Sequence, residues 1–343
     1  MTDKMNQPLL QVRDLRVSFH TYAGEVRAVR GVSFDLNRGE TLAFVGESGC
    51  GKTVTAKAVM RLLPKGFAQI EPGSKVIYDG QDVLAMNKRQ LMAYRGEQVG
   101  MIFQDPMTSL NPTMTCGKQI METLLLHRNL SKRQAYGEAL EMLRKVKIPD
   151  PELRMKNYPH QMSGGMRQRV MIAIALACSP SVLLADEPTT ALDVTIQAQI
   201  LDLLQELQQQ MGTAIVMVTH DLGVVANFAH RVQVMYAGQV IERGTVDDIF
   251  HNPQHPYTQA LLQSVPRPSE GSKRELYALG GTPPDLILPL NHCPFAARCK
   301  YRMSICEQSH PDETVLSPTH RANCWLMDPR APRVFDGQGR CAG

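Results

Sequence analysis

One short segment, Gly46 to Thr53, constrains this chain more than any other part of it. It reads GESGCGKT and matches the pattern G-x-x-x-x-G-K-[ST]. It follows the apolar run Leu42 to Val45 and precedes a helical stretch, as the pattern requires. Glycines let backbone N–H groups turn inward around phosphate oxygens, and the following helix points its positive end at the anion. The sequence therefore predicts a phosphate-binding loop, the phosphate loop hereafter, formed by Gly46, Glu47, Ser48, Gly49, Cys50, Gly51, Lys52 and Thr53.

Two carboxylates indicate what happens to the bound phosphates. The apolar run Ser181 to Ala185 ends in Asp186 and Glu187. In a nucleotide site, we expect Lys52 to reach the β- and γ-phosphates, while the Thr53 hydroxyl and Asp186 hold Mg²⁺. Glu187 points away from Asp186 and can act on the attacking water as general base. An acidic pair at a strand end is common by itself, and only the phosphate loop upstream gives it this catalytic interpretation.

The hydrophobic pattern predicts the fold class. Three apolar runs, Leu42–Val45, Ser181–Ala185 and Thr213–Thr219, read as buried strands separated by helical stretches. Strands that alternate with helices indicate an α/β fold with a mostly parallel sheet covered on both faces. One predicted helix ends at Gly212 and has apolar residues at helical spacing, namely Ile196, Ile200, Leu203, Leu204 and Leu207. Residues 231–242 read as a hairpin.

Two segments depart from this alternation. Residues 106–178 are rich in Met and Leu without a clear strand, which predicts a helical insertion. Residues 251–343, the C-terminal extension hereafter, hold 12 of the 22 Pro and five of the eight Cys. We therefore expect a nucleotide-binding domain over residues 1–250 and a separate, loop-rich domain over residues 251–343.

Composition excludes several classes of protein. The net charge of +4 is too small to indicate a nucleic-acid binder, so no nucleic-acid partner is expected. The longest apolar stretch without charges, Val170 to Ala185, is shorter than the roughly 20 residues of a spanning helix and contains Pro180. The N-terminus does not resemble a signal peptide. These features predict a protein that stays in the cytoplasm, where disulfides are disfavoured.

A third motif identifies a family. Met162 to Arg169 reads MSGGMRQR before an apolar helix, with Ser163 placed as N-cap and with glycines at 164 and 165. Together with the phosphate loop and the acidic pair, it resembles the signature of ATP-binding-cassette (ABC) ATPases, over about residues 8–250. The resemblance implies a P-loop NTPase core with an N-terminal antiparallel β subdomain, a helical subdomain, and here a small Cys-rich C-terminal extension.

The resemblance also implies roles for further residues. Gln104 matches the loop glutamine that touches Mg²⁺ and water, and His220 matches the switch histidine that contacts the γ-phosphate. Ala191-Leu192-Asp193 matches a loop that crosses the dimer interface. Phe19 stands where an aromatic ring stacks on adenine, with Tyr22 as a rival. One residue departs from the family pattern, because Met166 replaces the usual Gln of the signature.

The family mechanism implies an ATP-bound dimer. Each ATP lies between the phosphate loop of one subunit and the signature of the other, so Ser163, Gly164 and Gly165 act on the nucleotide of the partner subunit. Closure excludes water and completes the charge clamp around the phosphates.

Four cysteines in the extension form a cluster in sequence. Cys293, Cys299, Cys306 and Cys324 have the spacing C-x5-C-x6-C-x17-C. This pattern is compatible with free thiols, with structural Zn²⁺, or with an iron–sulfur cluster, and zinc sites usually have closer pairs. The segments HNPQHPYTQALLQSVP and CPFAARC resemble the C-terminal region of peptide-importer ATPases, which implies a [4Fe–4S] cluster as the first choice.

The same segments indicate a subgroup. IFQDPMTSLNP and ADEPTTALDVTIQAQIL also resemble the oligopeptide/dipeptide importer ATPases. Membership implies a second, different ABC ATPase, two transmembrane permeases and an extracytoplasmic peptide-binding protein as partners. It places the chain as a peripheral protein on the cytoplasmic face of the bacterial inner membrane. The resemblance implies ATP-driven import of oligopeptides. Import of dipeptides, nickel complexes or glutathione, and a soluble ABC ATPase without a transport role, are the alternatives.

Overall fold

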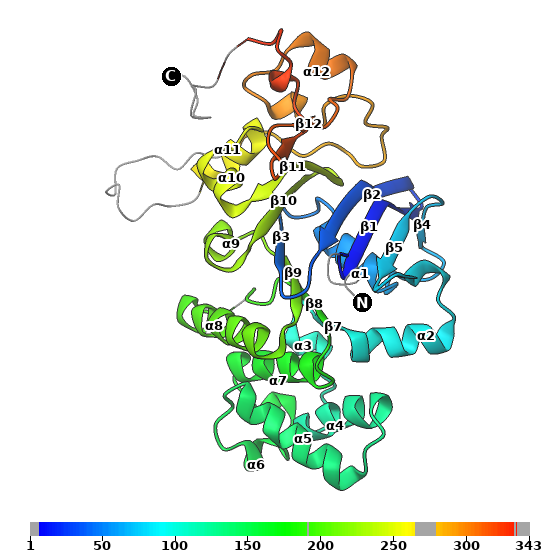
Figure 1. Ribbon diagram of the computed structural model, residues 1–343, viewed down its shortest axis with the longest axis vertical. Helices are drawn as coiled ribbons and strands as arrows, with labels where there is room; N and C mark the ends of the chain where they lie inside the picture. The colour runs from blue at the N-terminus through cyan, green and yellow to red at the C-terminus, as the bar shows by residue number, and fades with distance from the viewer. Residues whose placement is uncertain (1–6, 191, 265–278, 333, 335–343) are drawn as a thin grey trace. The chain divides into compact units, whose positions relative to one another are not determined.

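The computed structural model describes residues 7–190, 192–264, 279–332 and 334 (Figure 1). These residues form two compact units. The first unit contains the described residues of Met1–Leu10, Leu36–Thr41 and Tyr78–Val218, and the second contains those of Gln11–Asp35, Leu42–Ile77 and Thr219–Gly343. Because the chain passes between the units several times, the predicted boundary at residue 250 does not coincide with a boundary between them.

The second unit contains the phosphate loop and the C-terminal extension. Its strands are β1 (Leu10–Thr21), β2 (Gly24–Leu36), β3 (Thr41–Val45), β4 (Ala68–Ile70), β5 (Lys75–Tyr78), β10 (Arg231–Tyr236), β11 (Gln239–Thr245), β12 (Thr314–Val315) and β13 (Arg321–Ala322). Its helices are α1 (Lys52–Val59), α9 (Leu222–Phe228), α10 (Val246–His251), α11 (Pro256–Gln263) and α12 (Ser304–Gln308), with short 3-10 turns at Ala296–Arg298 and Trp325–Met327.

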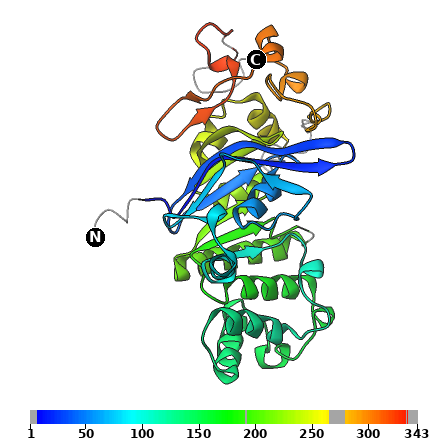
Figure 2. The same cartoon turned by 90° about the vertical axis from the view of Figure 1, so that its right-hand side faces the viewer.

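The long strands β1 and β2 confirm the predicted N-terminal antiparallel subdomain. They are neighbours in one sheet, joined by the two-residue turn Tyr22–Ala23, and Figure 2 shows them as a long blue ribbon. Short β4 pairs antiparallel with β1, with Phe19 opposite Ala68. A two-residue connection can join only antiparallel strands.

The predicted hairpin at 231–242 is also confirmed, as β10 and β11. The two strands pair antiparallel, and β10 pairs parallel with β3. The turn residues Ala237 and Gly238 both have positive φ, at +49° and +81°. That is the requirement of the primed turns that match the twist of a hairpin. Strand β13 then pairs with β11, and β12 with β13.

The first unit contains the acidic pair and the signature. Its strands are β6 (Gln81–Asp82), β7 (Val99–Ile102), β8 (Val182–Asp186) and β9 (Ala214–Val218). Its helices are α2 (Lys88–Ala93), α3 (Pro106–Ser109), α4 (Cys116–His127), α5 (Lys132–Lys145), α6 (Pro151–Arg154), α7 (Gly164–Leu176) and α8 (Val194–Met211). Strands β7, β8 and β9 pair parallel, and every residue in them is buried. This burial explains why they read as continuous apolar runs.

Helix α8 ends where the sequence predicts, at Gly212. Asp193 is its N-cap, and Oδ1 of this residue accepts a hydrogen bond from Ile196 N at 2.9 Å. Gly212 ends it in the left-handed conformation, with φ of +66°. The regular elements described between residues 106 and 178 are helices, which confirms the predicted helical insertion.

The C-terminal extension shares a hydrophobic core with the sheet of the second unit. Phe295, Cys293 and Cys306 pack in one buried cluster with Val45 and Tyr236. The ring of Phe295 meets that of Tyr236 edge-on at 5.3 Å. The described part of the extension is thus folded on the strand that leads into the phosphate loop.

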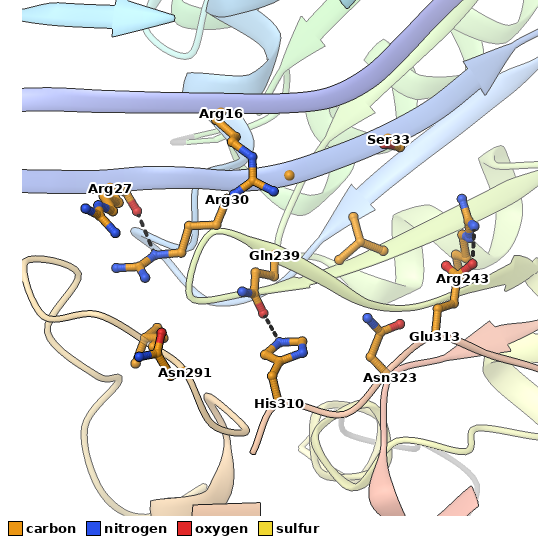
Figure 3. A pocket seen from close by; sticks show the side chains of 13 residues that line it. Arg16, Arg27, Arg30, Ser33, Gln239, Arg243, Asn291, His310, Glu313 and Asn323 are labelled. Carbon is orange, nitrogen blue, oxygen red and sulfur yellow. Dashed lines mark hydrogen bonds and ion pairs between the residues drawn. The ribbon is translucent and has the colours of Figure 1, made fainter. Parts of the chain in front are cut away.

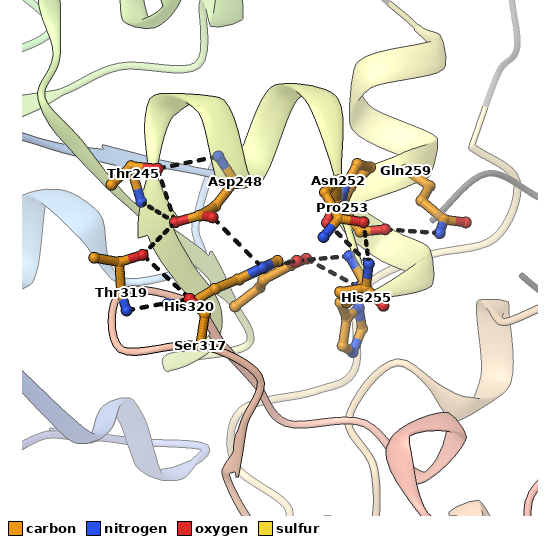
Figure 4. A network of polar contacts seen from close by, with 11 residues as sticks. Thr245, Asp248, Asn252, Pro253, His255, Gln259, Ser317, Thr319 and His320 are labelled. Carbon is orange, nitrogen blue, oxygen red and sulfur yellow. Dashed lines mark hydrogen bonds and ion pairs between the residues drawn. The ribbon is translucent and has the colours of Figure 1, made fainter. Parts of the chain in front are cut away.

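A buried polar network holds the extension in place (Figure 4). Glu242 in β11 is almost fully buried, and its two carboxylate oxygens accept hydrogen bonds from Gln254 N at 2.6 Å and His255 N at 2.9 Å. His320 Nε2 lies 2.8 Å from the same carboxylate. Burial lowers the pKa of His255 to about 3, so this ring is neutral, and its Nδ1 accepts a hydrogen bond from Tyr257 N.

We predict that Glu242→Ala destabilises the second unit by about 3 kcal/mol, because it leaves buried donors without their acceptor. The thermal unfolding midpoint, followed by circular dichroism, measures the effect. Asp247→Asn is the control, since Asp247 is 91% exposed and its loss costs less than about 1 kcal/mol. Equal midpoints for the two variants would contradict the role given to Glu242.

Candidate nucleotide-binding site

The phosphate loop leads from β3 into α1 and depends on glycines at defined positions. Gly46 has φ of +150°, and a Cβ there would lie 2.2 Å from Met235 O. Gly51 has φ of +103°, and its Cβ would lie 2.5 Å from Ala28 O. No residue with a side chain fits either position, so the neighbouring strands force glycine at both.

Lys52 is buried and held by the loop itself. Its Nζ donates hydrogen bonds to Gly46 O at 2.7 Å and to Glu47 O at 2.9 Å. An ammonium group positioned by the two carbonyls of the loop can exchange them for phosphate oxygens. Burial raises the pKa of the neighbouring Cys50 thiol, against the opposing effect of Lys52, so Cys50 is a packed thiol and not an activated one.

The acidic pair lies at the end of β8 in the first unit. Asp186 is buried and pairs with Val218 of β9. Glu187 has φ of +46°, a left-handed conformation, and its N–H donates to Val218 O at 2.8 Å. Residues other than glycine rarely adopt this backbone conformation without a local reason. The hydrogen bond from Glu187 N to Val218 O is such a reason.

The structure brings together Glu187 and Gln104, two residues predicted separately. Gln104 Nε2 donates to Glu187 Oε2 at 3.0 Å, and Thr190 Oγ1 donates to the same oxygen at 2.8 Å. Thr190 was not predicted, although its position three residues after Glu187 was a usable signal. The two donors fix the carboxylate in one orientation, which suits a group that must align water.

The signature forms the start of α7. Ser163 is its N-cap, as predicted, and Ser163 and Gly164 are exposed. A Cβ on Gly165 would lie 2.9 Å from Ile196 Cγ2, so glycine permits close packing of α7 on α8. Buried Gln168 Nε2 donates to Pro188 O at 2.5 Å and ties the signature helix to the segment after the acidic pair. Sequence analysis missed Gln168, because one glutamine on an apolar helix carries no distinctive pattern.

The remaining predicted site residues are His220, Asp193, Ala191, Phe19 and Tyr22. His220 is exposed and precedes α9, and Thr219 N donates to Phe44 O at 3.1 Å. Asp193 caps α8, whereas Ala191 lies outside the described residues. Phe19 is half-buried in β1, and Tyr22 is fully exposed in the following turn.

The four clustered cysteines do not gather as a metal site. Among the described residues, no group of three or more His, Cys, Asp and Glu side chains is arranged to hold a metal ion. All four thiols are free. Burial raises the pKa of Cys293 to about 11, and the other three cysteines add to the rise in the pKa of Cys324. Cys293 N donates to Cys306 O at 3.0 Å, and both residues lie in one buried cluster. The described residues do not support the predicted iron–sulfur cluster or its Zn²⁺ alternative.

A separate cavity of about 670 Å³ in the second unit carries no phosphate-loop residue (Figure 3). Four arginines line it, and Arg30 donates to the carbonyl oxygens of Leu286 and Leu288 at 2.7 and 3.1 Å. The other three are paired with carboxylates, as Arg16–Asp14, Arg27–Glu25 and Arg243–Glu313, at 2.8, 3.7 and 2.6 Å. Each arginine of this cavity thus has a carbonyl or carboxylate partner within the chain.

Comparison with known proteins identifies the class. The ABC transporter family model matches residues 29–190, and the model for the oligopeptide/dipeptide transporter C-terminal region matches residues 241–306. Two solved ABC structures share the fold. The dimeric cassette MJ0796 in a post-hydrolysis state bound to ADP and Pi is 26% identical, with a TM-score of 0.62, and covers 69% of this chain and 98% of its own. The cassette cbiO1 from Clostridium perfringens is also 26% identical, with a TM-score of 0.61, covering 71% and 91%.

Curated relatives extend over nearly the whole chain. The dipeptide transport ATP-binding protein DppD of Bacillus subtilis is 54% identical over 97% of this chain and 99% of its own length. The oligopeptide transport ATP-binding protein OppD of Salmonella typhimurium is 51% identical over 92% and 93%. The chain therefore belongs to the ABC transporter family and is an ATPase of that family. Within it, the chain groups with the oligopeptide/dipeptide transport ATP-binding proteins, which confirms the resemblance seen in the motifs.

No helix among the described residues is long and apolar enough to cross a membrane.

We predict that Glu187→Gln lowers ATP turnover more than about 100-fold, because the water loses its general base. The affinity for ATP should stay within about twofold, since the change removes charge but not shape. Phosphate release and fluorescent-nucleotide binding measure the two effects. Glu206→Gln, at an exposed carboxylate paired with Lys147, is the control. Unchanged turnover would remove Glu187 from the mechanism.

We predict that Gly51→Ala abolishes ATP binding, because the new Cβ meets Ala28 O and φ is positive. Gly137→Ala, at an exposed position in the middle of α5 with no atom near the added Cβ, should leave binding intact and stabilise the chain by about 0.5–1 kcal/mol. Binding of a fluorescent ATP analogue distinguishes the variants. Normal binding by Gly51→Ala would show that the loop backbone does not form the phosphate site.

Proposed function

We propose that this chain is the ATP-hydrolysing subunit of an importer that takes up oligopeptides from outside the cell. The observation that carries this proposal is the match over nearly the full length to dipeptide and oligopeptide transport ATP-binding proteins, extension included. The chain works as a peripheral protein on the cytoplasmic face of the bacterial inner membrane.

At the phosphate loop, the chain binds ATP through backbone N–H groups and Lys52. Lys52 leaves the carbonyls of Gly46 and Glu47 for the β- and γ-phosphates, an exchange of one set of oxygen acceptors for another. The buried position of the ammonium strengthens its attraction for phosphate, because little water screens it. Phe19 stacks on the adenine.

For hydrolysis, Glu187 orients the attacking water and accepts its proton. Gln104 and Thr190 keep the carboxylate in one orientation, so little reorganisation is needed in the transition state. His220 contacts the γ-phosphate. Thr53, Gln104 and Asp186 would hold Mg²⁺, and the bound ion would supply positive charge against the charge that develops on the phosphates.

The exposed signature requires a second ATPase subunit. Ser163 and Gly164 offer a hydroxyl and a helix N-terminus at the surface, and with Gly165 they act on the nucleotide bound by the partner. Asp193 lies in the loop that crosses the interface. We propose a different ABC ATPase as this partner, beneath two transmembrane permeases supplied by an extracytoplasmic peptide-binding protein.

Import of dipeptides is the second candidate function, because relatives of nearly equal identity are named for dipeptide and for oligopeptide transport. Substrate choice depends on the binding protein and the permeases, and the motifs of this chain do not distinguish the two.

The test is purification of the chain from mildly solubilised membranes, followed by reconstitution of what accompanies it. We expect a second cassette ATPase and two polytopic permeases, with ATP turnover stimulated several-fold by peptide-loaded binding protein. A complex that contains Glu187→Gln should assemble and should not transport. Recovery of the chain alone, or stimulation by a metal complex and not by peptide, would refute peptide import.

We propose as a separate point that Cys293, Cys299, Cys306 and Cys324 take up a [4Fe–4S] cluster when iron and sulfide are supplied. Two observations support this: Cys293 and Cys306 lie in one buried cluster against which Cys299 packs, and residues 241–306 match the oligopeptide/dipeptide transporter C-terminal region. Iron and acid-labile sulfide, assayed in protein purified without oxygen, test it. Zinc instead of iron would favour the alternative, and the absence of both would refute it.

A further inference from the structure

The second residue of the phosphate loop is held by the C-terminal extension. Arg298 binds the Glu47 carboxylate with both arms of its guanidinium, Nη1 to Oε2 at 2.7 Å and Nη2 to Oε1 at 2.8 Å. The Arg298 side chain is only 4% exposed. A bidentate pair of this kind is strong and geometrically defined.

Arg298 is itself fixed by four further contacts. Its Nε donates to Gly280 O at 2.9 Å, and its Nη2 donates to Leu279 O at 3.3 Å. Its Nη1 donates to the Tyr236 hydroxyl at 3.2 Å, and the guanidinium lies 5.7 Å from the centre of that ring. These contacts orient the guanidinium toward Glu47. The hydrogen bond to the Glu47 carboxylate, and after it the bond to the Tyr236 hydroxyl, raise the pKa of Arg298, which stays charged.

A second residue outside the nucleotide motifs, Tyr257, binds the backbone of Glu47. Glu47 N donates to the hydroxyl of Tyr257 at 2.8 Å. Tyr257 is fully buried, and its ring packs on Tyr236 at 4.7 Å and on Phe295 at 5.4 Å. Both the side chain and the amide of Glu47 are therefore held by residues 236–298.

The Glu47 peptide bears directly on ATP binding. Its carbonyl is one of the two that position the Lys52 ammonium, so a shift of this peptide moves the cation that must meet the phosphates. The carboxylate also places a negative charge in the loop that surrounds a polyanion. Unpaired, that charge would repel ATP, and Arg298 compensates it.

We propose that Arg298 and Tyr257 are positioning residues of the nucleotide site, through which the C-terminal extension sets the affinity for ATP. Arg298 neutralises Glu47 and fixes its side chain, and Tyr257 fixes its amide. The chemical step depends on other residues, so loss of either contact raises KM for ATP and leaves kcat nearly unchanged. The proposal depends on ATP binding alone, and failure of the peptide-import proposal would not affect it.

The test compares three variants of the full-length chain in binding a fluorescent ATP analogue with Mg²⁺. Arg298→Ala should weaken binding about tenfold, within the range of coupling between linked sites. Glu47→Gln should weaken it about twofold, because the amide keeps the shape and loses only the charge. The double variant should bind about as well as Glu47→Gln, since removal of the carboxylate removes the repulsion.

Three measurements separate positioning from simple loss of stability. The defect of Arg298→Ala should shrink at high salt, because salt screens the unpaired carboxylate. Arg298→Lys keeps the charge without the bidentate geometry and should bind with intermediate affinity. Asp328→Asn removes another ion pair of the extension, with Arg330, and should bind as the unaltered chain does.

Wild-type affinity in Arg298→Ala would overturn the proposal. So would a double variant that binds no better than Arg298→Ala, because the arginine would then support the fold without acting through Glu47. A fall in kcat at unchanged KM would also overturn it.

Discussion

The backbone turn between β3 and α1 exists only because glycine has no Cβ at Gly46 and Gly51. The atoms that would meet those Cβ atoms are backbone oxygens of β10 and β2. A backbone oxygen cannot rotate away as a side chain can. The distances from the loop to the neighbouring strands are therefore fixed. ATP binding therefore depends on the packing of strands far from it in sequence, and the extension that folds on β10 and β11 becomes part of the same constraint.

The acidic pair at the end of β8 is positioned by a strained backbone and not by glycine. Glu187 adopts a conformation that costs of the order of 1–3 kcal/mol for a residue with a side chain. Its N–H bonds to Val218 O, and its carboxylate accepts from Gln104 and Thr190, and these contacts hold it there. The loop in one unit avoids strain with glycine, whereas Glu187 in the other unit keeps a strained backbone that its hydrogen bonds hold.

Local patterns made much of this structure predictable from sequence. Asp193 and Gly212 bound α8 because capping and left-handed termination are local chemistry, and the strands were visible because burial on both faces leaves uninterrupted apolar runs. Gln168 and Arg298 were not predictable, because their partners lie 20 and 251 residues away. The cysteine pattern indicated a metal site that the described residues do not form, because spacing in sequence does not determine how side chains are arranged in space.

The bond between Glu47 and Arg298 has a consequence for evolution and for engineering. Position 47 is unrestricted in the phosphate-loop pattern, yet in this chain it is matched to a residue near the other end of the polypeptide. Homologues that change one of the two should change the other, so the pair should covary across the family. A chimera that exchanges the C-terminal extension between relatives must also exchange residue 47, because this residue and the arginine of the extension bind each other.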